Sequence, residues 1–146
     1  MTSVRQVLKT KAADVWTISP KASVYQALEL MALKDIGAVP VVDQDKLVGI
    51  FSERDYARKV ALHGRASKST MVGELKTAKV YYIQPDQTIE DCMALMTEKH
   101  IRHLPVLDAG NLVGIITIGD VVKAIIADQE ITIQSLKNYI TGSYGV

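Results

Sequence analysis

Apolar residues recur every three or four positions in two stretches of this chain, which is the spacing of a helix with one buried face. The two faces consist of Val24, Ala27, Leu28 and Met31, and of Ile89, Cys92, Met93 and Met96. Just before each stretch, Ser23 with Gln26 and Thr88 with Asp91 stand at the spacing of a capping box. The pattern therefore predicts one amphipathic helix starting near residue 24 and another starting near residue 89.

Two runs of β-forming residues follow each predicted helix, and a short polar segment joins them. The runs are Ala38–Val42 with Leu47–Phe51, and His103–Leu107 with Leu112–Ile116. Such pairs predict a hairpin in each half of the chain. An extended segment is predicted before each helix, at Val15–Ile18 and Val80–Ile83, and a second helix is predicted in each half, from near Glu53 and from near Ile118. The remaining predicted elements are a short helix around Met71–Leu75 and apolar terminal helices near Val4–Leu8 and Ile133–Ile140.

The two halves are repeats of one another at a constant offset. Pro20, Pro40, Gly49 and Asp55 recur 65 positions later as Pro85, Pro105, Gly114 and Asp120. Neither half has enough helix and sheet to cover its own apolar surface, so stacking of the two is expected to bury the core. We predict a single module over residues 1–146, made of a first repeat (8–62), a linker with a lead-in helix (63–79), a second repeat (80–127) and a C-terminal helix with a tail (128–146).

The composition of the chain restricts the classes of function that it can have. The chain has 17 Lys and Arg against 16 Asp and Glu, so it lacks the basic surplus that a nucleic-acid partner requires. It has no apolar run long enough to span a membrane and no apolar leader at its start, so no membrane association is expected. Cys92 is the single cysteine, which fits a reducing compartment. The expected location is the cytoplasm.

Two motifs in register make the chain resemble the CBS domain family, as a stand-alone tandem pair of the kind called a Bateman module. The motifs are Gly37–Asp43 with Leu47–Asp55, and Arg102–Asp108 with Leu112–Asp120. The resemblance implies an α+β fold in which each repeat is β-α-β-β-α. It also implies that the repeats pack sheet to sheet between flanking N- and C-terminal helices, with adenine nucleotides bound in the clefts between repeats.

The resemblance also implies which residues bind the nucleotide. The family pattern is Ser or Thr, two residues, then Asp after the last strand, and it occurs here as Ser52 to Asp55 and Thr117 to Asp120. The Asp would accept hydrogen bonds from ribose hydroxyls, and the hydroxyl residue with the helix-start amides would hold phosphate. The implied adenine contacts are Thr17, Ile18, Ala38, Val39 and Pro40 in the first repeat, and Tyr82, Ile83, His103, Leu104 and Pro105 in the second.

Other residues admit two interpretations. Each Ser/Thr–Asp pair is also at capping-box spacing and can cap a helix without any ligand. Arg54 in the first repeat and Arg102 with His103 in the second are candidate phosphate contacts, but Arg102 and His103 can equally be a surface and a half-buried side chain. His100 and His103 need not share a helix face, and Cys92 faces the core, so we predict no metal.

Three hypotheses follow. The first is a non-catalytic regulatory sensor, active in signal transduction, that binds AMP, ADP, ATP or NAD(H) and acts on an unidentified target protein. The second is a structural dimerisation or interaction module with degenerate clefts. The third, an enzyme using NAD, has no catalytic motif to support it. In either of the first two cases a homodimer is expected, because the terminal helices offer apolar faces and symmetric pairing is common.

Overall fold

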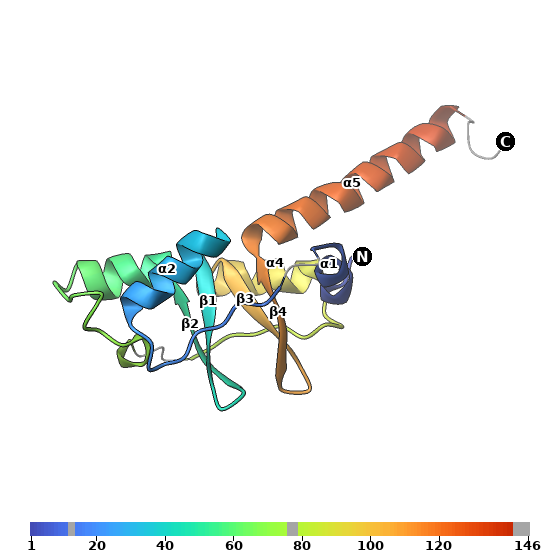
Figure 1. Cartoon of the computed structure of the whole chain (residues 1–146). Coiled ribbons are helices and arrows are strands. Elements are labelled where there is room, and N and C mark those ends of the chain that lie inside the picture. The colour runs from blue at the N-terminus through green and yellow to red at the C-terminus, as the bar shows by residue number, and fades with distance from the viewer. Residues whose placement is uncertain (12–13, 76–78, 142–146) are drawn as a thin grey trace. The chain divides into compact units, whose positions relative to one another are not determined.

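The computed structural model describes residues 1–11, 14–75 and 79–141 (Figure 1). Helices and two small antiparallel sheets make it a mixed α+β fold, as predicted. The predicted tail, residues 142–146, lies outside the described part of the chain. Two compact units can be distinguished: Met1–Ala13 with Ile83–Leu104 and Ile115–Val146, and Asp14–Tyr82 with Pro105–Gly114.

The predicted amphipathic helix of the first repeat is α2 (Val24–Lys34). The Ser23 hydroxyl accepts from the Gln26 amide while the Gln26 side chain accepts from the Ser23 amide, so both halves of the capping box form. Helix α2 ends at Asp35, whose φ of 53° places it in the left-handed region. The local sequence therefore specifies both ends of this helix.

Strands β1 (Ala38–Asp43) and β2 (Lys46–Ser52) form the first hairpin. They pair antiparallel from Ala38 opposite Ser52 to Asp43 opposite Lys46, with an irregularity after Val41. The turn residues Gln44 and Asp45 both have positive φ, as a two-residue hairpin loop of the mirror-image type requires. The register places Ser52 at the end of the sheet beside the start of β1.

The extended segment predicted at Val15–Ile18 is reduced to one parallel bridge. Ile18 bridges Val41, its amide donates to the Pro40 carbonyl at 3.0 Å, and its carbonyl accepts from the Val42 amide at 2.9 Å. Proline has no amide hydrogen but its carbonyl still accepts, so Pro40 can take part in this contact. The bridge holds Ile18 against the middle of β1.

The helix predicted from near Glu53 follows β2, beginning as the short α3 (Glu53–Asp55) and continuing as the π-helix η1 (Tyr56–Ala61). After the linker, the 3₁₀ helix η2 (Val72–Glu74) supplies the short helix predicted around residues 71–75. The core of this unit is apolar and consists of Val24, Ala27, Met31, Val39, Val41, Phe51, Val60, Val72 and Leu75. Side chains from the sheet, α2 and η2 thus share one core, which fixes the segment after β2 in place.

The second repeat has the same elements. Helix α4 (Ile89–Lys99) has a capping box from Thr88 and Asp91, and strands β3 (His103–Asp108) and β4 (Asn111–Thr117) form the second hairpin. Helix α1 (Val4–Lys11) belongs to the same unit as α4. The buried apolar side chains of these elements include Val4 and Val7 on α1, Ile89, Cys92 and Met96 on α4, Leu104 and Val106 on β3, and Ile116 on β4.

Helix α5 (Ile118–Thr141) is a single helix of 24 residues where the sequence analysis expected a repeat helix and a separate terminal helix. No proline interrupts these residues, and the only glycine, Gly119, lies at the start, so nothing in the sequence ends the helix. Its later turns project away from α1 and α4 (Figure 1). Among the described residues, no helix is both long and apolar enough to be a membrane span.

Candidate functional site

The end of β2 turns directly into a helix, and Ser52 and Asp55 close this turn. The Asp55 carboxylate accepts from the Ser52 amide at 2.9 Å and from its hydroxyl at 3.0 Å, and the Asp55 amide donates to Ser52 Oγ at 3.1 Å. The Glu53 amide donates to the carbonyl of Gly37 at 3.1 Å, which ties the turn to the residue before β1. Both side chains are half-buried. The predicted pair therefore meets at one place, at a helix start.

The second repeat builds the same turn at the end of β4. The Thr117 amide donates to Asp120 Oδ2 at 2.9 Å, the Asp120 amide donates to Thr117 Oγ1 at 3.1 Å, and the Ile118 amide donates to the Arg102 carbonyl at 2.9 Å. The capping function foreseen for both pairs is thus present in the structure. It accounts for the local geometry and leaves the hydroxyl and carboxylate oxygens able to accept further hydrogen bonds.

A cation that the sequence analysis did not identify contacts the second turn. Lys11, the last residue of α1, places its Nζ atom 2.9 Å from Asp120 Oδ2 and 3.0 Å from the carbonyl oxygen of Ile115. The side chains of Lys11 and Asp120 are 25% and 19% exposed. Burial raises the pKa of Asp120, but the Thr117 amide and the Lys11 ammonium together outweigh it and hold the pKa below its ordinary value.

The first turn has a different cation. Lys59, one helical turn after Asp55, places its Nζ atom 3.5 Å from Asp55 Oδ1. This pair is looser and its lysine is 39% exposed. The spacing of four residues within one helical segment is the signal that would have identified Lys59 from the sequence.

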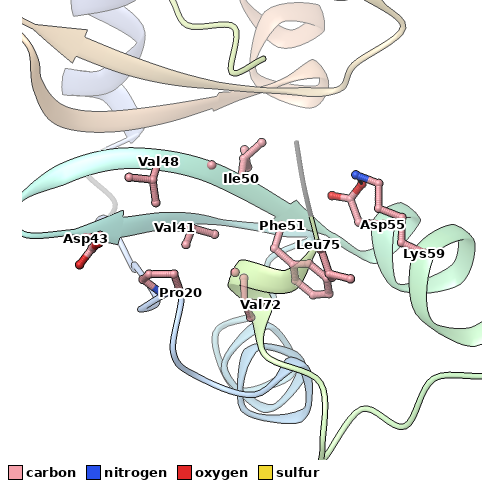
Figure 2. A pocket seen from close by; sticks show the side chains of 12 residues that line it. Pro20, Val41, Asp43, Val48, Ile50, Phe51, Asp55, Lys59, Val72 and Leu75 are labelled. Atoms are coloured by element: carbon pink, nitrogen blue, oxygen red, sulfur yellow. Dashed lines mark ion pairs between the residues drawn. The ribbon is translucent and has the colours of Figure 1, made fainter. Parts of the chain in front are cut away.

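A cavity of about 480 Å³ lies beside this first turn. Its lining residues are Pro20, Val41, Asp43, Val48, Gly49, Ile50, Phe51, Asp55, Lys59, Val72, Gly73 and Leu75. Figure 2 shows Asp55 and Lys59 extending from the helix after β2, and Phe51 near Val72 and Leu75. Largely apolar walls with two acidic groups, Asp43 and Asp55, and one basic group, Lys59, suit a ligand that combines a flat apolar ring with hydrogen-bonding groups.

The structure brings together several predicted contacts of the first repeat. Ala38 lies opposite Ser52, and Ile18 hydrogen-bonds across to Pro40. Ala38, Val39 and Pro40 are buried. Thr17 and Arg54 are exposed. Of all the predicted residues, Asp55 alone lines the cavity described above.

In the second repeat the predicted contacts differ in exposure. Ile83, Leu104 and Pro105 are buried, His103 is half-buried, and Tyr82 and Arg102 are exposed. His103 lies on β3, whereas His100 is the left-handed cap after α4, with φ of 55°. The two histidines therefore share no helix face, as predicted.

Cys92 is fully buried on α4, and burial, with a smaller effect of Asp91, raises its pKa to about 11. The thiol is therefore protonated at neutral pH and acts as a small apolar side chain, as predicted. Within residues 1–11, 14–75 and 79–141, no three His, Cys, Asp or Glu side chains come together as metal ligands.

Comparisons with known proteins agree on one family. A family model described as CBS domain matches residues 4–62 and 72–127. The mitochondrial CBS domain-containing protein CBSX3 of Arabidopsis thaliana is 38% identical over 153 residues, which cover 98% of this chain and 74% of that protein.

Solved structures point the same way. A protein with CBS domains from Burkholderia ambifaria MC40-6 is 54% identical, with a TM-score of 0.82, and the match covers 88% of this chain and 96% of that one. The crystal structure of CBSX2 in complex with AMP is 29% identical, with a TM-score of 0.71, and the match covers 88% of this chain and 99% of that one. The repeat boundaries given under Sequence analysis stay a prediction.

Proposed function

The chain belongs to the CBS domain family, and from this premise we propose that it is a non-catalytic regulatory module that binds an adenine nucleotide. The observation that carries the proposal is the pair of Ser/Thr–Asp turns, one at the last strand of each repeat. A helix start provides amide hydrogens and a partial positive charge, and a carboxylate beside it accepts hydrogen bonds from two neighbouring hydroxyls. Phosphate and ribose require these two features side by side.

The first repeat supports this assignment most directly. Its cavity joins the Asp55 carboxylate to apolar walls formed by Val41, Phe51, Val72 and Leu75. The carboxylate would accept from the ribose hydroxyls, and the apolar walls would contact the adenine ring. Lys59 is close enough to Asp55 to add positive charge for a phosphate.

AMP is the first ligand to test among AMP, ADP, ATP and NAD(H). The structure of CBSX2, which shares 29% of its residues with this chain, is a complex with AMP. Backbone groups near Ile18 and Ala38, and the side chains of Arg54, Arg102 and His103, are the further contacts we propose from the family pattern. The signalling role and the cytoplasmic location also stay predictions.

Isothermal titration of nucleotide-stripped protein with AMP, ATP, NAD⁺ and NADH tests the proposal. We expect saturable binding of at least one nucleotide, and a loss of roughly 1–3 kcal/mol at the affected site in Asp55→Ala or Asp120→Ala. Asp91→Ala is the matched control, because Asp91 closes the same kind of capping box with Thr88 at the start of α4 and should leave affinity unchanged. No binding of any nucleotide by folded protein, or equal affinity in all three variants, would refute the proposal.

Self-assembly is a second candidate function, and the exposed face of α5 favours it. Val122, Ile126, Ile133, Leu136 and Ile140 follow the alternating three- and four-residue spacing of a coiled-coil seam, with Gln129 at the remaining position. Their exposed fractions run from 41% at Val122 to 80% at Ile140. The partner that fits such a stripe is a helix with the same stripe, so we propose a homodimer in which α5 pairs with α5 of a second copy.

Light scattering coupled to size-exclusion chromatography tests this pairing. Leu136→Glu places a charge in the seam and should convert dimer to monomer. Ile131→Glu is the control, because Ile131 is 66% exposed but lies off the stripe and should leave the dimer intact. A wild-type monomer at all concentrations, or dimers in both variants, would contradict the proposed seam.

A further inference from the structure

Helix α1 is held firmly on the second repeat's unit. The Val4 amide donates to the Gln87 carbonyl at 2.8 Å, and the Arg5 amide donates to the Pro85 carbonyl at 3.0 Å. Val4 is fully buried, and Thr2 Oγ1 donates to Asp128 Oδ1 at 2.7 Å. The start of the helix is therefore fixed, and this determines where its last residue lies.

That last residue is Lys11, and its ammonium lies on the carboxylate proposed to bind ribose. Asp120 Oδ2 accepts from Lys11 Nζ and from the Thr117 amide, both at 2.9 Å, and Lys11 also donates to the Ile115 carbonyl. Two partners hold the ammonium in place. A neutral ribose hydroxyl is a weaker donor to a carboxylate than an ammonium, so it competes poorly for an oxygen that already accepts a charged hydrogen bond.

The first repeat has the same lead-in contacts at the start of its own lead-in segment. The Val72 amide donates to the Ala22 carbonyl at 2.9 Å and the Gly73 amide to the Pro20 carbonyl at 2.8 Å, which repeats the pattern of Val4 and Arg5. The described part of this lead-in is the 3₁₀ turn of η2, and Val72 and Gly73 of that turn line the cavity beside Asp55. Among the residues that the structure describes, this carboxylate pairs with Lys59, at 3.5 Å and on the same helical segment.

We propose that Lys11 sets the difference in nucleotide affinity between the two sites. By occupying the Asp120 carboxylate, Lys11 keeps the site of the second repeat in a low-affinity state, so nucleotide binds first at the site of the first repeat. The inference rests on the proposed function, since it concerns the same carboxylates. It assigns α1, a segment before the first repeat's hairpin, to control of the second repeat's site.

The test compares Lys11→Met with Lys9→Met, both in an Asp55→Ala background so that the second repeat's site is the one observed. Methionine keeps an apolar chain of similar length and removes the charge. Lys9 is an exposed lysine of the same helix and serves as the control. Titration with AMP, and with NAD⁺ in parallel, should show roughly five- to tenfold tighter binding in Lys11→Met and no change in Lys9→Met, the scale of one partly buried ion pair.

Weaker or unchanged binding in Lys11→Met would overturn the proposal, because the lysine would then be a ligand contact or have no part in binding. A second readout separates this result from a failure of the proposed function. The carboxyl pKa of Asp120, followed by NMR, should rise towards its ordinary value in Lys11→Met and stay low in Lys9→Met. If no variant binds either nucleotide, the proposed function fails and the site preference with it, whereas an unchanged Asp120 pKa would refute the Lys11 contact itself.

Discussion

The substitution Asp120→Asn tests how much the contact between α1 and the second turn contributes to folding. Asparagine keeps an oxygen that can accept from the Thr117 amide, so the helix cap is retained, but the negative charge that Lys11 contacts at 2.9 Å is lost. Both side chains are only partly exposed, and Lys11 can still reach water, so we expect a loss of about 1 kcal/mol in the free energy of unfolding. Asp120→Ala also removes the cap and should cost about 2 kcal/mol.

The loss of stability in Asp120→Asn should depend on pH in a defined direction. The folded-state pKa of Asp120 is lowered from 3.8, so the unfolded chain takes up the proton first as the pH falls. The contribution of Asp120 is therefore complete above about pH 5, and it is lost as the pH falls through 3.8 and on through the folded-state pKa. The stability difference between wild type and Asp120→Asn should be constant near neutrality and shrink in acid.

Urea unfolding followed by circular dichroism between neutral pH and pH 3 measures this difference. Asp86→Asn is the control, because Asp86 pairs with Arg5 of the same helix at 2.9 Å but is 90% exposed, and it should change stability little. The reasoning is refuted if Asp120→Asn is as stable as wild type at pH 7, or if the difference stays constant or grows in acid.

Two further predictions concern packing. The Cys92 thiol, buried and with a pKa of about 11, should not react with a thiol reagent in the native protein and should react once urea unfolds it; rapid native labelling would contradict its burial. Gly73→Ala should destabilise the protein, because a Cβ atom there would lie 2.9 Å from the Pro20 carbonyl oxygen. Gly119→Ala, near the start of α5 with its nearest contact at 3.6 Å, should stabilise the protein by roughly 0.5–1 kcal/mol. Thermal unfolding of both variants measures the two effects, and the opposite order of stability would show the packing to be wrong.

Local rules predicted most of the secondary structure. Helix α2 and helix α4 begin where Ser23 and Thr88 predicted, because a capping box involves only four consecutive residues. Both hairpins lie where alternating β-forming runs flank a short polar turn. The prediction of a repeat helix and a separate terminal helix was wrong, since α5 runs unbroken from Ile118 to Thr141 and no helix-ending residue lies between the two predicted helices.

The candidate site, too, was only partly predictable from the sequence. The Ser52–Asp55 and Thr117–Asp120 turns were predictable because each closes within four residues at the end of a strand. Lys59 was overlooked although its spacing from Asp55 is local. The cavity beside Asp55 could not be predicted, because its walls come from segments as distant as Pro20 and Leu75.

By itself, the sequence determined the repeat, the first helix and the hairpin of each half, the helix caps and the two acidic turns, because each depends on hydrogen bonds or periodicity over a few neighbouring residues. Only the tertiary structure decided which cation meets each acidic group. Lys11 and Asp120 are 109 positions apart, and they meet because backbone hydrogen bonds seat α1 on the turn before α4 and so bring the end of α1 to the start of α5. The repeats are alike in sequence, but in the described part of the chain their sites differ, because the last residue of α1 reaches one carboxylate and Lys59 of the same helical segment pairs with the other.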